Sequence, residues 1–269
     1  WKLFDWFKNN PGRGKGMRFA INSNMCPETP KVLNKLIEQS WHVPNLEIYT
    51  SMESTGKQAE YIRDGLNYDE WMSNLHRVLN EANLSSLHMM MTINSLCLNS
   101  ITEFMDEMLD LREQYGKRAP TLSLNILRFP SFQSNAILPD DIKSVYKDKL
   151  DMWYKSERPQ EMLHDGEKAS VARLIDYLDI VKTPHKNTAD KEKLHNDFKA
   201  FFAQYDIRRG KNFAETFPGP LAEWFESLTS EIPTAEKILS KELALTVSDT
   251  AVDPKTTETY IDQTDDILK

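Results

Sequence analysis

Cysteine is scarce in this chain, which has two among its 269 residues, Cys26 and Cys97. Two cysteines cannot form a disulfide framework, and their use is typical of a protein of the reducing cytoplasm. A four-iron cluster needs at least three Cys thiolates from the protein, and a structural zinc site needs four close nitrogen or sulfur ligands. The six histidines add no HExxH spacing. We therefore expect a cytoplasmic location and no metal site from this chain.

Long apolar runs are also missing. No stretch approaches the roughly 20 apolar residues that span a bilayer, and no signal-peptide pattern is present, so we expect no membrane association. Acidic residues outnumber basic ones by 41 to 33, and the net charge of −8 argues against a general nucleic-acid-binding surface. No GxGxxG, Walker or GxSxG motif occurs, which weakens dinucleotide, nucleotide and serine-hydrolase interpretations.

The first ten residues, WKLFDWFKNN, place Trp1, Leu3, Phe4, Trp6 and Phe7 at mixed helical spacing. This pattern is typical of the end of an amphipathic helix that is already under way. We therefore expect a fragment that starts inside a larger fold, although trimming of a longer chain gives the same pattern.

Four strand-like runs, each followed by a helical pattern, organise the first 156 residues. Strand–helix alternation at intervals of about 30 to 40 residues is the signature of βαβ units on a parallel sheet. Short right-handed connections wind such units into an open sheet or a barrel. The predicted strands are 17–22, 45–50, 87–93 and 121–129, and the predicted helices are 29–41, 68–82, 99–116 and 139–156.

After residue 157 the pattern changes to helices without strands. Helices are predicted over 169–181 and 191–210, with two more at 220–228 and 234–245. The last residues are polar and acidic, which is typical of a loosely ordered tail. We therefore divide the chain into an α/β region (1–156), a mostly helical region (157–245) and a polar tail (246–269).

Polar side chains gather where the predicted strands end. In parallel α/β folds the functional end is the C-terminal edge of the strands, which here brings 22–24, 51–56, 94–99 and 128–134 to one rim. Ser51, Glu53 and Arg63 form the best constellation. A hydroxyl and a carboxylate suit the hydroxyls of a ribose, and a guanidinium clamps a carboxylate through its planar fork. Spacing alone favours the alternative of a capped turn with a surface Glu–Arg pair.

Two further rim residues are weaker candidates for substrate contact. Arg128 follows the fourth predicted strand within RFPSFQSN, and Asn99 stands at the turn before the helix 99–116. For the Arg128 segment, simple closure of the rim is an equal alternative. The cations of segment 208–211 indicate either an anion site or, more simply, a helix C-terminus, which favours positive charge.

The order of these pieces resembles the radical S-adenosylmethionine enzymes, entered partway through their partial (β/α)6 barrel. MRFAINSNMC resembles the third strand of that family, which commonly ends in a Thr-Asn-Gly-like turn, where Ser23-Asn24-Met25 stands. LEIYTSMES resembles the fourth strand, which commonly ends in Ser-hydrophobic-Asp-Gly, and EYIRDG resembles the segment that carries the family's arginine. MMMTINSLCLNSITEFMDEM resembles the fifth strand and its helix. The likeness is greatest to the subgroup with a "twitch" region, often of bacterial or phage origin.

The resemblance implies that Ser51 binds the ribose of S-adenosylmethionine and that Arg63 binds its carboxylate. Asn24 and Glu53 would line the same pocket, with Glu53 in place of the usual Asp and Met25 in place of the usual Gly. The family's CxxxCxxC loop, which holds a [4Fe-4S] cluster, and its Gly-Gly-Glu-Pro-like turn do not occur here. Both would lie upstream of Trp1 in a longer protein. The full-length protein is therefore expected to use both cofactors, while this chain alone supplies no cluster ligand and no radical chemistry.

Three functional hypotheses stay open. The first is the C-terminal part of a radical S-adenosylmethionine enzyme that modifies a peptide or another macromolecule. The second is a non-catalytic α/β scaffold or partner-binding module that retains the fold. The third is an ordinary barrel enzyme with Glu53 as a base, which four evident strands disfavour because a closed barrel of this type has eight.

Overall fold

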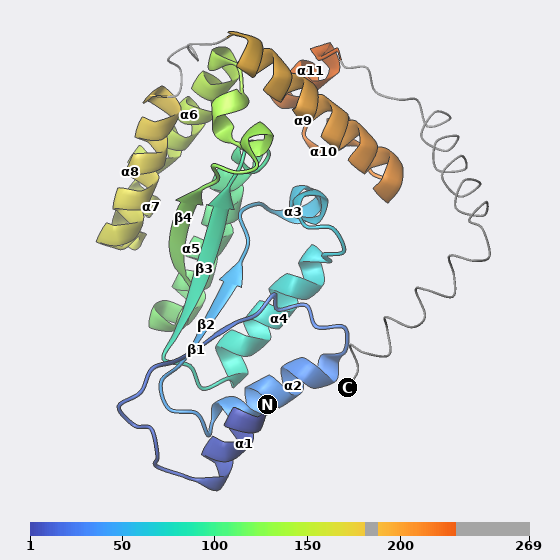
Figure 1. The fold of residues 1–269 in the computed structure, drawn as a ribbon. Helices are drawn as coiled ribbons and strands as arrows, with labels where there is room; N and C mark the ends of the chain where they lie inside the picture. The colour runs from blue at the N-terminus through green and yellow to red at the C-terminus, as the bar shows by residue number, and fades with distance from the viewer. Residues whose placement is uncertain (181–187, 230–269) are drawn as a thin grey trace, which may run out of the picture.

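The computed structural model describes residues 1–180 and 188–229, and its strands form one parallel sheet (Figure 1). The strands are β1 (Phe19–Asn22), β2 (Leu46–Ser51), β3 (Ser86–Ile93) and β4 (Thr121–Ile126), hydrogen-bonded in the order β1-β2-β3-β4. The predicted α/β class is confirmed. The fourth strand ends three residues earlier than predicted, because the chain turns at Pro130 into a short 3₁₀ segment, η3 (Ser131–Gln133).

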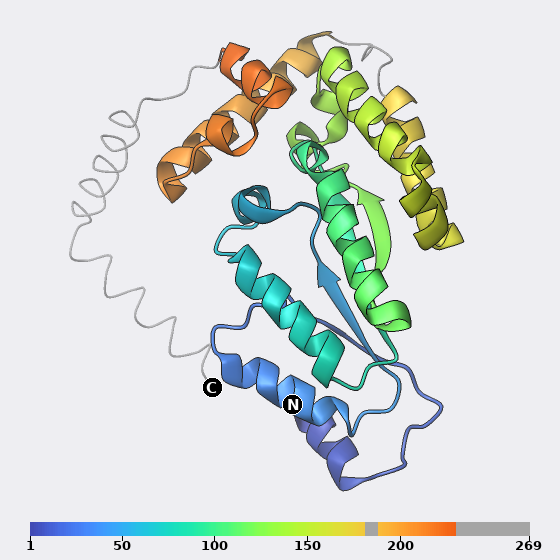
Figure 2. The ribbon, with the colours of Figure 1, turned by 180° about the vertical axis from the view of Figure 1, so that it is seen from behind.

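A helix follows each strand at every predicted place. These helices are α2 (Pro30–Ser40), α3 (Gly56–Ile62), α4 (Tyr68–Glu81), α5 (Ile101–Tyr115) and α6 (Asp140–Lys155), with α1 (Lys2–Asn9) before the sheet. Asn67 caps α4 by accepting a hydrogen bond from the backbone N–H of Glu70, and Gly116 ends α5 at a positive φ of 57°. Figure 2, the view from behind, shows α4 and α5 in front of the sheet, so these helices cover one of its faces.

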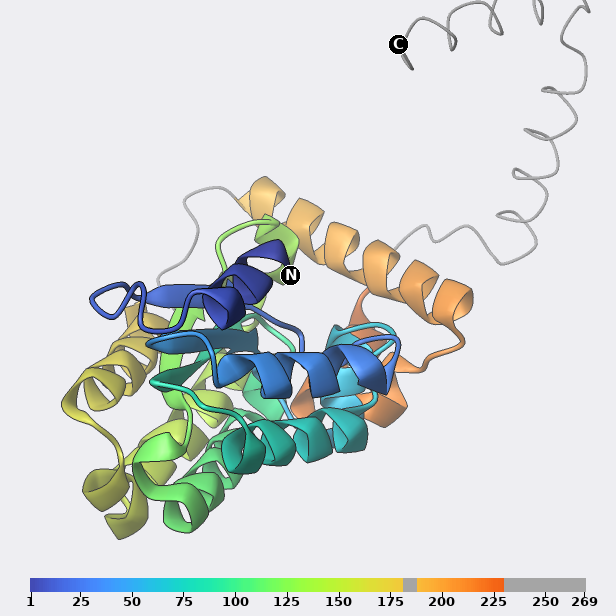
Figure 3. The ribbon, with the colours of Figure 1, turned by 90° about the horizontal axis from the view of Figure 1, so that it is seen from below.

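The described residues after α6 form helices, as predicted. It contains α7 (Glu157–Met162), α8 (Asp165–Ile180), α9 (Thr188–Arg209), α10 (Phe213–Thr216) and α11 (Pro220–Ser227). The predicted helix 234–245 and tail 246–269 lie outside the described residues. Figure 3, seen along the strands, shows α2, α4 and α5 together on one side, with α9 away from them. None of the helices in the described part of the chain is long and apolar enough to cross a membrane.

Within the described residues, the apolar side chains of the sheet are buried mainly on one of its faces. In β3 the side chains of Leu87, Met89, Met91 and Ile93 are buried, whereas the alternate residues 86, 88, 90 and 92 are partly or fully exposed. Parallel sheets normally bury both faces and read as continuous apolar runs, so this alternation is unusual. We call the second face the open sheet face; its side chains are Arg18, Ala20, Asn22, Glu47, Tyr49, Ser51, Ser86, His88, Met90, Thr92, Thr121, Ser123 and Asn125.

Helix α8 covers the outer edge of β4. The Glu167 carboxylate accepts a hydrogen bond from the backbone N–H of Leu122 at 2.7 Å, and Arg173 donates to the carbonyl of Leu124 at 2.9 Å. Arg112 of α5 pairs with both oxygens of Glu167, at 2.7 and 2.8 Å, with both side chains buried. Unpaired backbone groups at a strand edge favour aggregation. At the edge of β4, the side chains of Glu167 and Arg173 hydrogen-bond two of these backbone groups. The described sheet therefore ends at β4.

An aromatic cluster attaches the last helices to the rest of the fold. Phe198, Phe213 and Phe217 are fully buried. Tyr61 of α3 packs edge-on against Phe213 and Phe217, with ring centroids 5.9 and 5.0 Å away. Helix α9 lies beyond the C-terminal ends of the strands (Figure 1). This packing brings α9 and α10 against the segment that carries Arg63.

Candidate functional site

The segment after β2 holds a buried acid and an arginine in direct contact. Glu53 has 2% of its surface exposed, and its Oε2 accepts a hydrogen bond from Nη2 of Arg63 at 2.5 Å. Burial raises the pKa of Glu53 above its ordinary range, although Arg63 and a backbone hydrogen bond at Thr92 act in the opposite direction. The structure therefore brings together two of the predicted site residues, and Glu53 holds the guanidinium of Arg63 in place.

Arg63 keeps hydrogen-bonding capacity that this pair does not use. Its side chain is 31% exposed, and its Nε is buried without a hydrogen-bond partner. A guanidinium has five N–H donors, and a buried unpaired donor costs free energy. A cavity of about 110 Å³ lies next to this segment, lined by Tyr61, Ile62, Asn94, Leu96, Gln133, Phe201, Phe202 and Tyr205. Arg63 itself does not line this cavity and its Nε is buried, so a ligand with a hydrogen-bond acceptor can reach the guanidinium only through the exposed part of the side chain.

Helices α9 and α10 hold the residues on both sides of Arg63. The hydroxyl of Tyr61 donates to Oδ1 of Asp206 at 2.6 Å, and the hydroxyl of Tyr205 donates to the backbone carbonyl of Tyr61 at 2.8 Å. Burial and the bond to Asp206 both raise the pKa of Tyr61, so its hydroxyl stays a donor. Lys211 donates to the carbonyl of Glu60 at 2.7 Å. The position of Arg63 thus depends on the C-terminal helices.

Asp64, which follows Arg63 directly, forms ion pairs with two of the cations in segment 208–211. Its carboxylate lies 3.0 Å from Arg209 and 2.9 Å from Lys211. Lys211, followed by Arg209, lowers the pKa of Asp64, which keeps the carboxylate charged. These contacts give the two cations a structural role beside Arg63.

The two remaining predicted cofactor residues lie at the C-terminal ends of two neighbouring strands, β1 and β2. Ser51 ends β2 and is half-buried on the open sheet face, in register with Met90 of β3. Asn24 follows β1, is exposed, and its Oδ1 accepts the backbone N–H of Cys26 at 3.2 Å. Met25 has a positive φ of 58°, a backbone conformation that favours glycine. A buried side chain and a hydrogen bond from Asn74 to its carbonyl keep Met25 there.

The two predicted substrate residues have different surroundings. Asn99 is tied to α6, because its Oδ1 accepts the hydroxyl of Tyr146 at 3.0 Å and its backbone carbonyl accepts Lys149 at 3.0 Å. Arg128 is exposed and lines a cavity of about 540 Å³ near the end of β4. Of this pair, Arg128 is therefore the residue with free capacity to bind.

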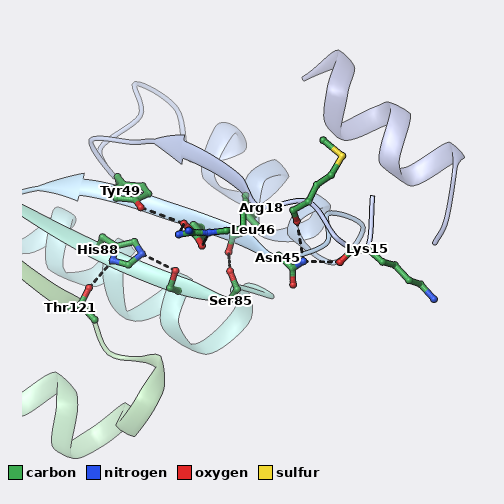
Figure 4. Close-up of polar contacts among 11 residues, drawn as sticks. Lys15, Arg18, Asn45, Leu46, Tyr49, Ser85, His88 and Thr121 are labelled. Atoms are coloured by element: carbon green, nitrogen blue, oxygen red, sulfur yellow. Dashed lines mark hydrogen bonds and ion pairs between the residues drawn. The ribbon is translucent and has the colours of Figure 1, made fainter. Parts of the chain in front are cut away.

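The open sheet face carries a polar network that sequence reasoning missed (Figure 4). Arg18 pairs with both oxygens of Glu47, at 2.7 and 2.9 Å. The ring of Tyr49 stacks on His88, with centroids 4.5 Å apart. Nδ1 of His88 hydrogen-bonds Thr121 at 2.7 Å, so the network reaches from β1 to β4. A partial signal was present in the predicted strands, where polar residues stand at most alternate positions, with Ala20 and Met90 as exceptions.

Neither cysteine is placed as a metal ligand. Cys97 is fully buried, and burial raises the pKa of its thiol. Burial also raises the pKa of the Cys26 thiol. Among residues 1–180 and 188–229, no group of three or more His, Cys, Asp or Glu side chains is placed to hold a metal ion. The donor set of the described chain therefore does not fit an iron–sulfur cluster.

Comparison of the chain with protein-family models, with curated proteins and with solved structures finds no match. The functional argument therefore depends on the geometry of the rim and of the open sheet face.

Proposed function

We propose that this chain supplies the S-adenosylmethionine-binding rim of a radical S-adenosylmethionine enzyme. The observation that carries the proposal is the pairing of buried Glu53 with Arg63 at the C-terminal end of β2, which leaves 31% of the Arg63 side chain exposed. A sulfonium amino acid presents a carboxylate, and a guanidinium that is oriented by a buried carboxylate binds such a group well.

Each rim residue has a separate part in this proposal. Arg63 binds the carboxylate of the cofactor, and Ser51 donates a hydrogen bond to its ribose. Glu53 orients Arg63, a role that suits a carboxylate with 2% exposure better than direct ribose contact. Asn24 lines the pocket from the turn after β1, where Met25 keeps the backbone conformation that a glycine would adopt.

We further propose that the sheet is part of a (β/α)6 barrel. Consecutive parallel strands lie side by side in chain order, and right-handed crossovers place all their helices on one face of such a sheet. The other face is polar and accessible, as the interior of a partial barrel is when it receives a ligand. A cytoplasmic location is also proposed, which the two free cysteines support.

The described residues do not fit the [4Fe-4S] cluster, so we derive no electron-transfer step from this chain. When bound in the complete enzyme, the cluster would supply the electron that cleaves S-adenosylmethionine. The part assigned to this chain is to bind and orient the cofactor. A peptide or another macromolecule is proposed as the substrate.

Calorimetric titration tests the carboxylate assignment. S-adenosylmethionine and 5′-methylthioadenosine, which lacks the amino-acid carboxylate, are titrated into the chain and into Arg63→Ala. Because a charged hydrogen bond is lost, the variant should bind S-adenosylmethionine roughly tenfold or more weakly. Its affinity for methylthioadenosine should not change.

Arg77→Ala is the matched control, since Arg77 forms an exposed pair with Glu81 on α4 at 3.1 Å and does not lie near the rim. It should bind both ligands as the parent chain does. If the parent chain shows no saturable binding, or if Arg63→Ala weakens both ligands equally, the proposal is wrong.

The scaffold hypothesis is the second candidate, and one observation favours it. Arg63 pairs directly with the buried carboxylate of Glu53 at 2.5 Å, as an arginine with a purely structural role would. In that case Arg63→Ala should lower the stability of the chain, and neither ligand should bind at all. The same titration therefore separates the two candidates.

A further inference from the structure

A cavity of about 540 Å³ opens between the end of β4 and α8, away from the Glu53–Arg63 pair. Its lining consists of Asn125, Ile126, Arg128, Arg173, Asp176, Tyr177 and Ile180. The volume falls in the range of roughly 300 to 1,000 Å³ that is usual for small-molecule pockets. Asn125 belongs to the open sheet face and is in register with Thr92 of β3. The cavity therefore adjoins that face at the strand ends, where parallel sheets bind their ligands.

Two guanidinium groups set the charge of this cavity. Arg128 is exposed and has no hydrogen bond or ion pair with any described residue. Arg173 is fixed by a single hydrogen bond to the backbone carbonyl of Leu124, which leaves most of its five donors unused. Most other arginines of the described chain face a carboxylate, as Arg112 faces Glu167 and Arg18 faces Glu47. Arg118 also donates only to backbone carbonyls, but Arg128 and Arg173 line the same cavity, where neither pairs with a carboxylate of the described residues.

The remaining polar groups of the lining complete the chemistry. Tyr177 contributes a half-buried phenol and Asn125 an exposed amide. Asp176 is the one carboxylate of the lining, so the lining carries a net charge of +1 from two arginines and one aspartate. The phenyl ring of Phe129, next to Arg128 in the chain, is 84% exposed and offers an apolar surface.

We propose that the β4–α8 cavity binds the anionic group, a phosphate or a carboxylate, of a small ligand. Arg128 and Arg173 contact the anion, and Asn125 and Tyr177 supply further hydrogen bonds. Arginine suits this role because its planar fork donates two parallel hydrogen bonds to either group. The proposal does not depend on S-adenosylmethionine, since it uses none of the residues assigned to that cofactor.

The test uses three aromatic probes that differ only in their polar group: phenyl phosphate, benzoate and phenol. Binding of each to the chain is followed by NMR titration in the absence of S-adenosylmethionine. Saturable binding of phenyl phosphate or benzoate, without binding of phenol, is expected, and the tighter of the two identifies the anion. Arg128→Gln should weaken that binding by roughly tenfold, because a charged hydrogen bond is lost.

Two further variants sharpen the result. Asp176→Asn should tighten anion binding by about twofold to fivefold, because it removes an opposing exposed charge. Arg13→Gln is the matched control, since Arg13 is exposed and does not line the cavity, and it should bind as the parent chain does. The proposal is overturned if neither anion saturates, if phenol binds equally well, or if Arg128→Gln and Arg13→Gln bind alike. Arg128 is exposed, so its variant tests binding in a folded chain.

Discussion

Tyr49 of β2 and His88 of β3 stack across neighbouring strands on the open sheet face, with ring centroids 4.5 Å apart. Both ring nitrogens of His88 have hydroxyl partners, Ser86 at 2.8 Å and Thr121 at 2.7 Å. The register places the two rings directly opposite one another. Hydrogen bonds and ring stacking among its own side chains therefore order this face (Figure 4).

Replacing the stacked tyrosine tests how much this order contributes to stability. Tyr49→Leu keeps apolar bulk but removes the ring and its hydroxyl, and an aromatic pair contributes about 0.5 to 1.5 kcal/mol beyond area burial. We expect the free energy of unfolding in urea to fall by about 1 kcal/mol. Tyr154→Leu is the control, since Tyr154 is half-buried and no ring of the described residues stacks on it. A loss no greater than that of the control would show that the stack is incidental.

The Arg112–Glu167 pair should contribute strongly to stability. Arg112→Met leaves Glu167 buried without its cation, and breaking a buried pair in this way costs roughly 3 to 5 kcal/mol. Arg158→Met removes an arginine that faces Asp110 and Glu113 at the surface and should cost about 1 kcal/mol or less. Urea unfolding measures both. Equal losses would mean that the coverage of the β4 edge does not depend on this pair.

Acid should weaken the same contact. Burial alone would raise the pKa of Glu167, but hydrogen bonds from Arg112, Leu122 and His164 outweigh burial and lower the pKa below its ordinary value. A carboxyl group with a lowered pKa stabilises the folded state at pH values above its pKa in the unfolded chain, about 4.3. This stabilisation is lost as the pH falls through its pKa in the folded protein. The parent chain should therefore lose stability below about pH 4.3 more steeply than Glu167→Gln does. Thermal unfolding between pH 3 and 7 compares the slopes, and identical slopes would contradict this account.

Glu53 should show the opposite pH dependence. Because its pKa is raised in the folded protein, the folded state binds this proton more tightly than the unfolded state does. The contribution of Glu53 to stability is therefore complete below about pH 4.3, the pKa in the unfolded chain, and is lost as the pH rises through the pKa in the folded protein. In Glu53→Gln that loss should be absent. S-adenosylmethionine affinity should nevertheless fall in this variant at pH 7, because Arg63 loses the anion that orients it. An unchanged affinity would leave Glu53 without a role in positioning Arg63.

Contacts from the C-terminal helices should hold Arg63 in the position that binds S-adenosylmethionine. Tyr61→Phe removes the hydroxyl that donates to Asp206 at 2.6 Å, two residues before Arg63. Stability should fall by about 1 to 2 kcal/mol, and S-adenosylmethionine should bind more weakly. Tyr154→Phe is the control, because the hydroxyl of Tyr154 makes no hydrogen bond to the described residues. Weaker stability with unchanged affinity would show that α9 and α10 stabilise the fold without positioning Arg63.

Local patterns in the sequence predicted most elements of the fold. The strand-like run 87–93, the apolar stripe of the predicted helix 29–41 and the glycine at position 116 are each patterns among neighbours in the chain. The parallel order of the strands followed from the length of the helical connections. That order in turn predicted that the residues after β2 would lie at one rim.

The sequence by itself thus determined the α/β class, the positions of the strands and the presence of Glu53 and Arg63 near the end of β2. Only the tertiary structure decided that Glu53 is buried against Arg63, that α9 and α10 hold the segment around them, and that Arg128 lines a cavity with Arg173. Partners such as Tyr61 and Asp206 are 145 residues apart in the chain. Contacts over such distances depend on packing between helices, which no local pattern of residue types encodes.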